Sequence, residues 1–333
     1  MTECSGCAAL YLVDLQEGLE HIGRGAFLCC DDLVQLELPA TLRELGYFAF
    51  SDCASLMSVR FAGNEVHRLP DRLFHGCSSL ARLKLPEEIS AIGKRCFSGC
   101  ESLRNLYFGT PLTELGSYAF ERCDKLASLG LSAQELPSGL LDGCSSLSWF
   151  NLADGTLRIR FGAFAGSGVQ GVSIPASVEE IEAGAFYQMH GSVSLDEENA
   201  HYALIDGSVY TADGKTLLAF FPADPYAEEP QTEFVLPEGV ERIASYALAE
   251  STLSTVVLPA SLQRIDAYAF ADSAVEELEI PAGVDVDPDA FRSPGGSGDE
   301  GGEEPDEPGE DPVPEIIGSV AGEKNLFREE DYA

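Results

Sequence analysis

The residues best suited to chemistry in this chain are its 10 cysteines, most of which recur at a nearly constant spacing. Thiols at fixed intervals could form disulfides, bind a metal ion or act as nucleophiles. Those that stand three residues after a recurring anchor are Cys30, Cys53, Cys77, Cys100, Cys123 and Cys144, with Cys7 extending the series. In later copies of the phrase the same slot holds Ser167, Met189, Ser251 and Ser273. A slot that accepts serine and methionine indicates a small packing site rather than a metal site.

These thiols are expected to be free and packed inside the protein. If the copies stack, successive cysteines have Cα atoms about 4.8 Å apart, which is within disulfide range. Their Cβ vectors run parallel, however, and keep the Cβ atoms about 4.8 Å apart where a disulfide prefers about 3.8 Å. Cys4-x-x-Cys7 resembles half of a zinc or redox motif, but no second Cys-x-x-Cys completes it. Cys29 and Cys96 fall outside the series and are predicted to be the exposed, oxidisable thiols.

No other constellation points to catalysis. The 5 histidines share no spacing, and the metalloprotease, serine-hydrolase, P-loop and dinucleotide fingerprints are all missing. Acidic pairs such as Glu87-Glu88 fall on turns between copies, which is typical of a solvated surface. The sequence therefore predicts a protein that is not an enzyme, with no catalytic residues, no metal site and no cofactor.

The elements that hold these residues are repeats of about 22 residues. Each carries the phrase Ala-Phe-x-x-Cys-x-x-Leu, and the residues at its Phe position are Phe27, Phe50, Phe74, Phe97, Phe120, Leu141, Phe164, Phe186, Leu248, Phe270 and Phe291. Upstream of the phrase, Leu80 to Leu85 alternate apolar and polar residues as a strand does, and Pro86 ends that strand. A fixed period in this range is typical of a solenoid, in which each unit buries its apolar face against its neighbours.

About 22 residues leave no room for a long helix, so we expect each repeat to hold a strand, a second extended stretch and one turn of 3₁₀ helix. The predicted fold class is a mostly β and coil solenoid of about eleven repeats, with parallel strands about 4.8 Å apart and a length of roughly 50 Å. Residues 1–292 are assigned to the solenoid and 293–333 to a separate tail.

The pattern Leu-x-x-Leu-x-Leu-Pro-x-x-Val-x-x-Ile-Gly-x-x-Ala-Phe-x-x-Cys resembles the BspA-type leucine-rich repeat of bacterial surface proteins, over about residues 4–292. The resemblance implies a curved solenoid whose Leu-x-x-Leu-x-Leu strands line the concave face. It also implies adhesion or protein–protein binding at the cell surface or after secretion. It offers no catalytic residues to carry over.

The anchor series is interrupted once, between Phe186 and Leu248. An insert at about 193–234 contains Asp213-Gly214 between two β-rich runs, which is a strong signal for a hairpin turn. BspA-like proteins carry a similar insert. Calcium binding by Asp206 and Asp213 is the alternative, and the lack of a dense carboxylate loop disfavours it.

Composition restricts the partners. A net charge of −36 argues against nucleic acid and anionic membranes, which require clustered Lys and Arg. No apolar run is long enough to span a bilayer, and residues 1–30 show no signal peptide. The chain opens inside a repeat without a polar cap, so we expect a piece of a longer or trimmed protein with an N-terminal end open to self-association. The acidic, Pro/Gly-rich tail is predicted to be a disordered linker.

The candidate binding site lies at the x positions of the Leu-x-x-Leu-x-Leu strands. Read down the stack, these positions gather basic and aromatic side chains at Arg60, Arg82, Lys84, Arg104, Tyr107, Trp149 and Asn151. Interface anchors are enriched in Trp, Tyr and Arg. The patch is predicted to bind a protein segment or glycan of acidic character; the alternative is that its cations only keep the sheet soluble. A surface adhesion module and a cytoplasmic interaction scaffold are both open as functions.

Overall fold

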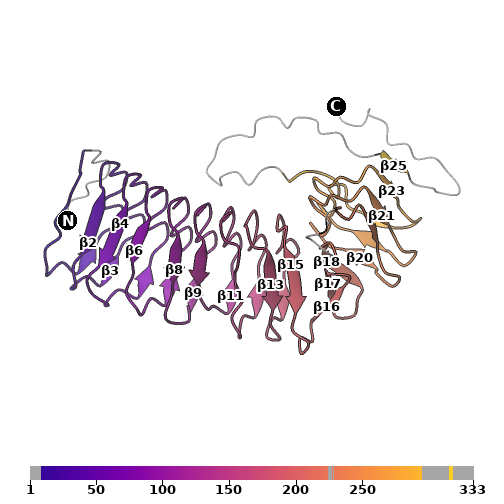
Figure 1. Cartoon of the computed structure of the whole chain (residues 1–333), viewed down its shortest axis with the longest axis horizontal. Coiled ribbons are helices and arrows are strands. Elements are labelled where there is room, and N and C mark those ends of the chain that lie inside the picture. The colour runs from indigo at the N-terminus through magenta and orange to yellow at the C-terminus, as the bar shows by residue number, and fades with distance from the viewer. Residues whose placement is uncertain (1–8, 224–226, 228, 295–314, 318–333) are drawn as a thin grey trace.

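The computed structural model describes residues 9–223, 227, 229–294 and 315–317, which form a solenoid of about eleven turns. The described residues form strands and turns and contain no helix, so the predicted fold class is confirmed. Figure 1 shows the turns side by side along the long axis of the molecule, from β2 (Gln35–Leu38) to β15 (Ser192–Leu195). The strands of the insert follow β15 and lead into the last repeats.

The Leu-x-x-Leu-x-Leu segments form the longer strands of the solenoid. They pair in parallel with their buried apolar residues in register, as between Leu36 and Val59. The further long strands of the repeats are β4 (Ser58–Phe61), β6 (Arg82–Lys84), β8 (Asn105–Tyr107), β10 (Ser128–Gly130), β13 (Gly171–Ile174), β19 (Glu233–Val235), β21 (Thr255–Val257) and β23 (Glu277–Glu279). Strand β25 (Glu315–Ile317), from the tail, pairs in parallel with the last of these strands. One side of each strand faces the core and the other faces solvent, because side chains alternate along a strand.

A second row of two-residue strands runs along another side of the solenoid and also pairs in parallel. These short strands are β1 (His21–Ile22), β3 (Glu44–Leu45), β5 (Arg68–Leu69), β7 (Ala91–Ile92), β9 (Glu114–Leu115), β11 (Glu135–Leu136), β12 (Arg158–Ile159), β14 (Glu180–Ile181), β20 (Arg242–Ile243), β22 (Arg264–Ile265) and β24 (Asp285–Val286). Their second residues, such as Ile159, point into the core, and their first residues are mostly charged and exposed or half-buried.

The anchor segment closes each repeat, and it differs from the 3₁₀ turn that we expected. Cys100 N donates to Phe97 O (3.0 Å) within the turn, as in a 3₁₀ helix, but Phe97 N donates to Ala119 O (2.8 Å) in the next repeat. The alternation between bonds within the turn and bonds to the next repeat accompanies left-handed φ angles at Arg95 (53°) and Gly99 (75°). Alternating backbone hands cannot continue as a helix, so the segment forms a flat turn that stacks on the next copy.

The anchors form an aromatic column through the interior. Ring centroids of successive anchors from Phe27 to Phe120 lie 5.4–5.8 Å apart, with interplanar angles of 4–16°. Leu141 interrupts the column, and the Phe164–Phe186 pair resumes it at 5.7 Å. Because each ring contacts only the adjacent repeats, the core is built one neighbour at a time.

The insert contains three antiparallel strands, β16 (Tyr202–Ile205), β17 (Ser208–Thr211) and β18 (Thr216–Ala219). They lie inside the range 193–234 expected for it. The hydrophobic core is divided here, since Val209 packs with the N-terminal repeats and the adjacent Tyr210 with the C-terminal ones. Phe220 N donates to Ala247 O (2.7 Å), the bond that an anchor makes, so Phe220 holds an anchor position that the sequence series omitted.

The two aspartates considered for calcium binding lie at opposite ends of β17. Asp206 has a left-handed φ of 49° in the two-residue turn between β16 and β17. Asp213 accepts hydrogen bonds from Thr211 Oγ1 (2.7 Å) and Lys215 N (3.1 Å) in the turn to β18. The two aspartates therefore lie in separate turns, which favours the hairpin interpretation.

Candidate functional site

The predicted site residues lie on the solvent-facing side of the long strands and of residues 147–152, which hold the same place in a repeat without an assigned strand. This side is here called the long-strand face. Register pairing brings Arg60 beside Lys84 on adjacent strands, and places Arg82 two residues before Lys84 on β6. Arg104 directly precedes β8, and Tyr107 ends that strand. The exposed residues of this predicted set are Arg60, Arg82, Lys84, Arg104, Tyr107, Trp149 and Asn151.

Most cations of this group have no partner among the described residues. Arg60 forms an ion pair with Glu37 (3.4 Å). The side chains of Arg82, Lys84 and Arg104 form no ion pair or hydrogen bond with any described residue. Arg60, Arg82, Lys84, Arg104 and Tyr107 together are called the cationic zone.

A shallow, open groove runs along one edge of the cationic zone. Its volume is about 640 Å³, and it is lined by residues that include Lys84, Leu85, Tyr107 and Phe108. Glu87 and Glu88 line it as well, so the groove carries acidic as well as basic and aromatic side chains.

The two exposed aromatic residues of the site each lie toward a glycine of the following repeat. A Cβ atom placed on Gly130 would lie 2.7 Å from Tyr107 Cδ1, and one on Gly171 would lie 3.9 Å from Trp149 Cζ3. Tyr107 and Trp149 nevertheless remain 66% and 69% exposed. Gly130 leaves room for the ring of Tyr107, whereas a Cβ atom at position 171 would make an ordinary van der Waals contact with Trp149.

Trp149 and Asn151 belong to a part of the face that differs from the cationic zone. Over four successive repeats every outward position is uncharged: Ala127, Ser128, Gly130, Ser148, Trp149, Asn151, Gln170, Gly171, Ser173, Ser192 and Ser194. This set is called the uncharged zone. The structure therefore divides the single basic and aromatic patch predicted from the sequence into two surfaces.

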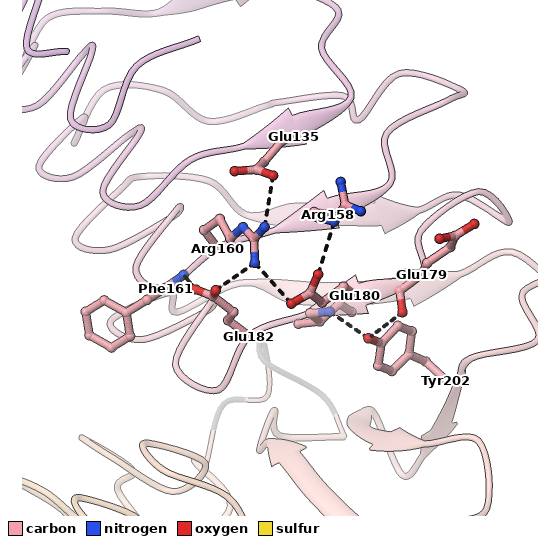
Figure 2. A network of polar contacts seen from close by, with 9 residues as sticks. Glu135, Arg158, Arg160, Phe161, Glu179, Glu180, Glu182 and Tyr202 are labelled. Atoms are coloured by element: carbon pink, nitrogen blue, oxygen red, sulfur yellow. Dashed lines mark hydrogen bonds and ion pairs between the residues drawn. The ribbon is translucent and has the colours of Figure 1, made fainter. Parts of the chain in front are cut away.

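Charged residues also line the short strands, where they are paired. Arg160 is the centre of one network, with Nη2 donating to Glu135 (3.0 Å) and Nη1 to Glu180 (3.0 Å) and Glu182 (2.8 Å) (Figure 2). The hydrogen bonds to Glu135 and Glu182 raise the pKa of Arg160 further above its ordinary value. In the last repeats, Arg242 and Arg264 both bind the buried carboxylate of Asp266, at 2.6 and 2.7 Å.

The sequence reasoning missed this charged ladder. Its signal was present, because the first residue of most short strands is Arg, Glu or Asp at the repeat spacing. Parallel strands place such residues side by side, about 4.8 Å apart, so opposite signs form ion pairs across repeats.

The cysteine column lies in the interior, and its thiols are poor nucleophiles. Cys53, Cys77, Cys100, Cys123 and Cys144 are buried thiols without disulfides, and each Sγ donates to the carbonyl of the preceding repeat's anchor at 3.0–3.2 Å. Burial raises the pKa of Cys53 and of Cys144 to about 12, so the nucleophilic thiolate is disfavoured.

The prediction for the two cysteines outside the column was half wrong. Cys29 is exposed, as expected, but Cys96 is fully buried. It directly precedes the anchor, a slot held by buried alanines such as Ala49 and Ala119. Cys96 is therefore one more small packing residue.

Metal sites, membrane-spanning helices and the N-terminal end of the solenoid were also subjects of prediction. Within the described ranges, no cluster of three His, Cys, Asp or Glu side chains could hold a metal ion. No helix in the same ranges could cross a membrane. At the N-terminal end, Tyr11 and Leu12 are exposed. Cys4, Cys7 and most of the tail lie outside the described residues.

Comparison with known proteins agrees with this architecture. The family model described as BspA type Leucine rich repeat region, in 6 copies, matches residues 2–127, 67–193 and 222–293. A leucine rich cell surface protein from Faecalibacterium prausnitzii has 21% identity and a TM-score of 0.57, covering 84% of this chain and 76% of its own. The pneumococcal vaccine antigen PcpA has 18% identity and a TM-score of 0.49, covering 80% and 70%.

No curated protein sequence matches the chain. The likeness to solved structures concerns the fold alone, whereas the family model covers most of the sequence. The repeat pattern, the anchor column and this match together show that the chain belongs to the BspA-type leucine-rich repeat family.

Proposed function

We propose that this chain is a non-enzymatic binding module of a bacterial surface protein, and that its cationic zone binds an acidic segment of a partner protein. The supporting observation is the contrast between the row of short strands and the row of long strands. Every arginine within the short strands, namely Arg68, Arg158, Arg242 and Arg264, pairs with a carboxylate. In the cationic zone only Arg60 does so. In a chain with 56 acidic residues, cations left without carboxylates are available for an external one.

The zone has the composition of a protein interface. Exposed Tyr107 and three arginines supply side-chain types that are enriched among energetic anchors.

The overall charge does not prevent binding of an acidic ligand. Charges separated by more than about 8 Å are largely screened at physiological salt, so the nearby cations dominate once contact is made. The charge does exclude long polyanions such as nucleic acid, which would also meet the surrounding acidic surface.

Surface location is part of the proposal. It is supported by the family and by the printed description of the Faecalibacterium structure as a cell surface protein. Fractionation of the native cells, followed by immunodetection, tests it; recovery only in the cytosol would contradict it.

The test of binding uses oligoglutamate as the acidic probe and oligoglutamine as its neutral match. Two unit charges about 4 Å apart in water interact by about 1 kcal/mol. Reversing one charge turns the attraction into repulsion, so the interaction energy changes by twice that amount. The double variant Arg82→Glu, Lys84→Glu should therefore bind oligoglutamate at least about tenfold more weakly, even after screening.

The matched control changes the same net charge elsewhere. Arg43 and Lys125 are exposed, lie outside the long-strand face and have no ion pair with a described residue. The variant Arg43→Glu, Lys125→Glu should retain wild-type affinity. Equal weakening by both variants would show that only net charge matters, and unchanged affinity in the first would refute the assigned surface.

A further inference from the structure

The uncharged zone is unusual for this protein. In the chain as a whole 23% of residues are charged, yet every outward position from Ala127 to Ser194 on the long-strand face is neutral. Charge returns on both flanks, with Arg104 before the zone and Glu233 after it. A solvent-facing sheet ordinarily carries charges for solubility, so their absence over four repeats indicates a surface used for contact.

Trp149 is the prominent side chain of this zone. It is 69% exposed, and its ring lies toward Gly171 of the following repeat. The indole N–H forms no hydrogen bond with any described residue, although tryptophan N–H groups usually find a partner when they are covered. The ring thus offers an apolar side and a free donor to a ligand.

Four polar side chains of the uncharged zone are also available to a ligand. The side chains of Ser128, Asn151, Ser173 and Ser194 form no hydrogen bonds within the described part of the chain. Hydroxyls and a carboxamide both donate and accept hydrogen bonds and carry no charge. They suit a ligand that itself presents neutral hydroxyl groups.

We propose that the uncharged zone binds a neutral polysaccharide, with Trp149 stacking on the apolar side of a sugar ring and the Ser and Asn side chains bonding its hydroxyls. An acidic peptide or an anionic glycan would find no counter-charge in this zone. A single small sugar would find no enclosing pocket, whereas an extended chain can lie along the stacked strands. The site is separate from the cationic zone and does not depend on the function proposed for it.

The sequence supplies a site-specific reporter, because Trp149 is the 1 tryptophan of the chain. Soluble β-glucan, xylan, mannan and starch are titrated into the full chain while its fluorescence is recorded, with heparin as the anionic comparison. At least one neutral polysaccharide should shift the emission to shorter wavelength in a saturable manner. If none does, or if only heparin does, the proposal is overturned.

Variants then locate the site by affinity electrophoresis in gels that contain the active polysaccharide. Trp149→Ala should weaken binding at least tenfold and Asn151→Ala about threefold, which correspond to the loss of an aromatic anchor and of one hydrogen bond. The control Tyr47→Ala removes another exposed aromatic residue, outside this face, and should bind as the wild type does. Arg82→Glu, Lys84→Glu should also bind normally. Equal retention of all four variants would overturn the assignment to Trp149, and loss in the charge variant would merge the two sites.

Discussion

Replacing Ser167 by cysteine should stabilise the solenoid. Ser167 occupies the cysteine slot of its repeat, is 8% exposed, and its Oγ has no hydrogen-bond partner. In the repeat before it, Cys144 Sγ donates to Phe120 O at 3.1 Å. By the same register, a thiol at position 167 would face the carbonyl of Leu141.

The expected gain follows from the cost of the orphaned hydroxyl. A buried polar group without a partner costs about 1–3 kcal/mol, whereas a thiol packs as a small apolar group. The slot has room for a larger side chain, because Met189 fills it in the next repeat at 6% exposure. We therefore expect Ser167→Cys to raise the free energy of unfolding by about 1–2 kcal/mol.

The assay is urea unfolding under reducing conditions, followed by circular dichroism and by Trp149 fluorescence. The midpoint should rise while the m value stays constant, since the surface exposed on unfolding is unchanged. The reverse change is the control: Cys144→Ser should be more harmful than Cys144→Ala, because the shorter serine side chain is expected to leave its hydroxyl without a partner, as Ser167 does in the same slot, and alanine adds no hydroxyl. A neutral or destabilising Ser167→Cys, or a milder effect of serine at position 144, would refute the reasoning.

Three further outcomes follow from the same structure. Alkylation of the folded protein should modify Cys29 rapidly and spare Cys53, Cys96 and Cys144 until denaturant is added, as measured by mass spectrometry of peptides; fast labelling of Cys96 would contradict its burial. Burial raises the pKa of Asp142, so its charged form destabilises the fold at neutral pH and the penalty fades as pH falls through the raised pKa. Asp142→Asn should therefore raise the thermal midpoint at neutral pH and lose that advantage in acid, and a pH-independent difference would argue against this cause. Gly99→Ala should destabilise the fold by about 1 kcal/mol or more, because Gly99 has a left-handed φ of 75°. Gly155→Ala is the comparison, because Gly155 has a φ of 97° and an added Cβ there would meet no atom within 4 Å, so that variant measures the backbone contribution alone.

The sequence predicted the solenoid well because each repeat places the same side chain at the same depth. The Phe and Cys columns, the parallel strands and the solvent-facing positions all follow from the period. Cys96 was misplaced because it was compared with the other cysteines. Comparison with residues in its own slot, which are mostly alanines, would have predicted burial.

Features that depend on contacts between repeats were harder to predict from the sequence. Arg160 forms ion pairs with carboxylates of the repeat before its own and of the repeat after it, so no single repeat shows the arrangement. The left-handed turns are also hidden, since Phe48 and Tyr118 take positions that glycine holds in other repeats. The division of the binding face required register, because the sequence alone joined Trp149 to the cations.

The most direct measurement of the central claim is the footprint of a bound acidic probe. An oligoglutamate peptide with a photoreactive group is cross-linked to the full chain at physiological salt, and the modified peptides are identified by mass spectrometry. Binding at the cationic zone predicts cross-links to strands β4, β6 and β8, centred on residues 82–107, which are lost in Arg82→Glu, Lys84→Glu. Cross-links concentrated on the short strands, or spread evenly along the solenoid, would contradict it.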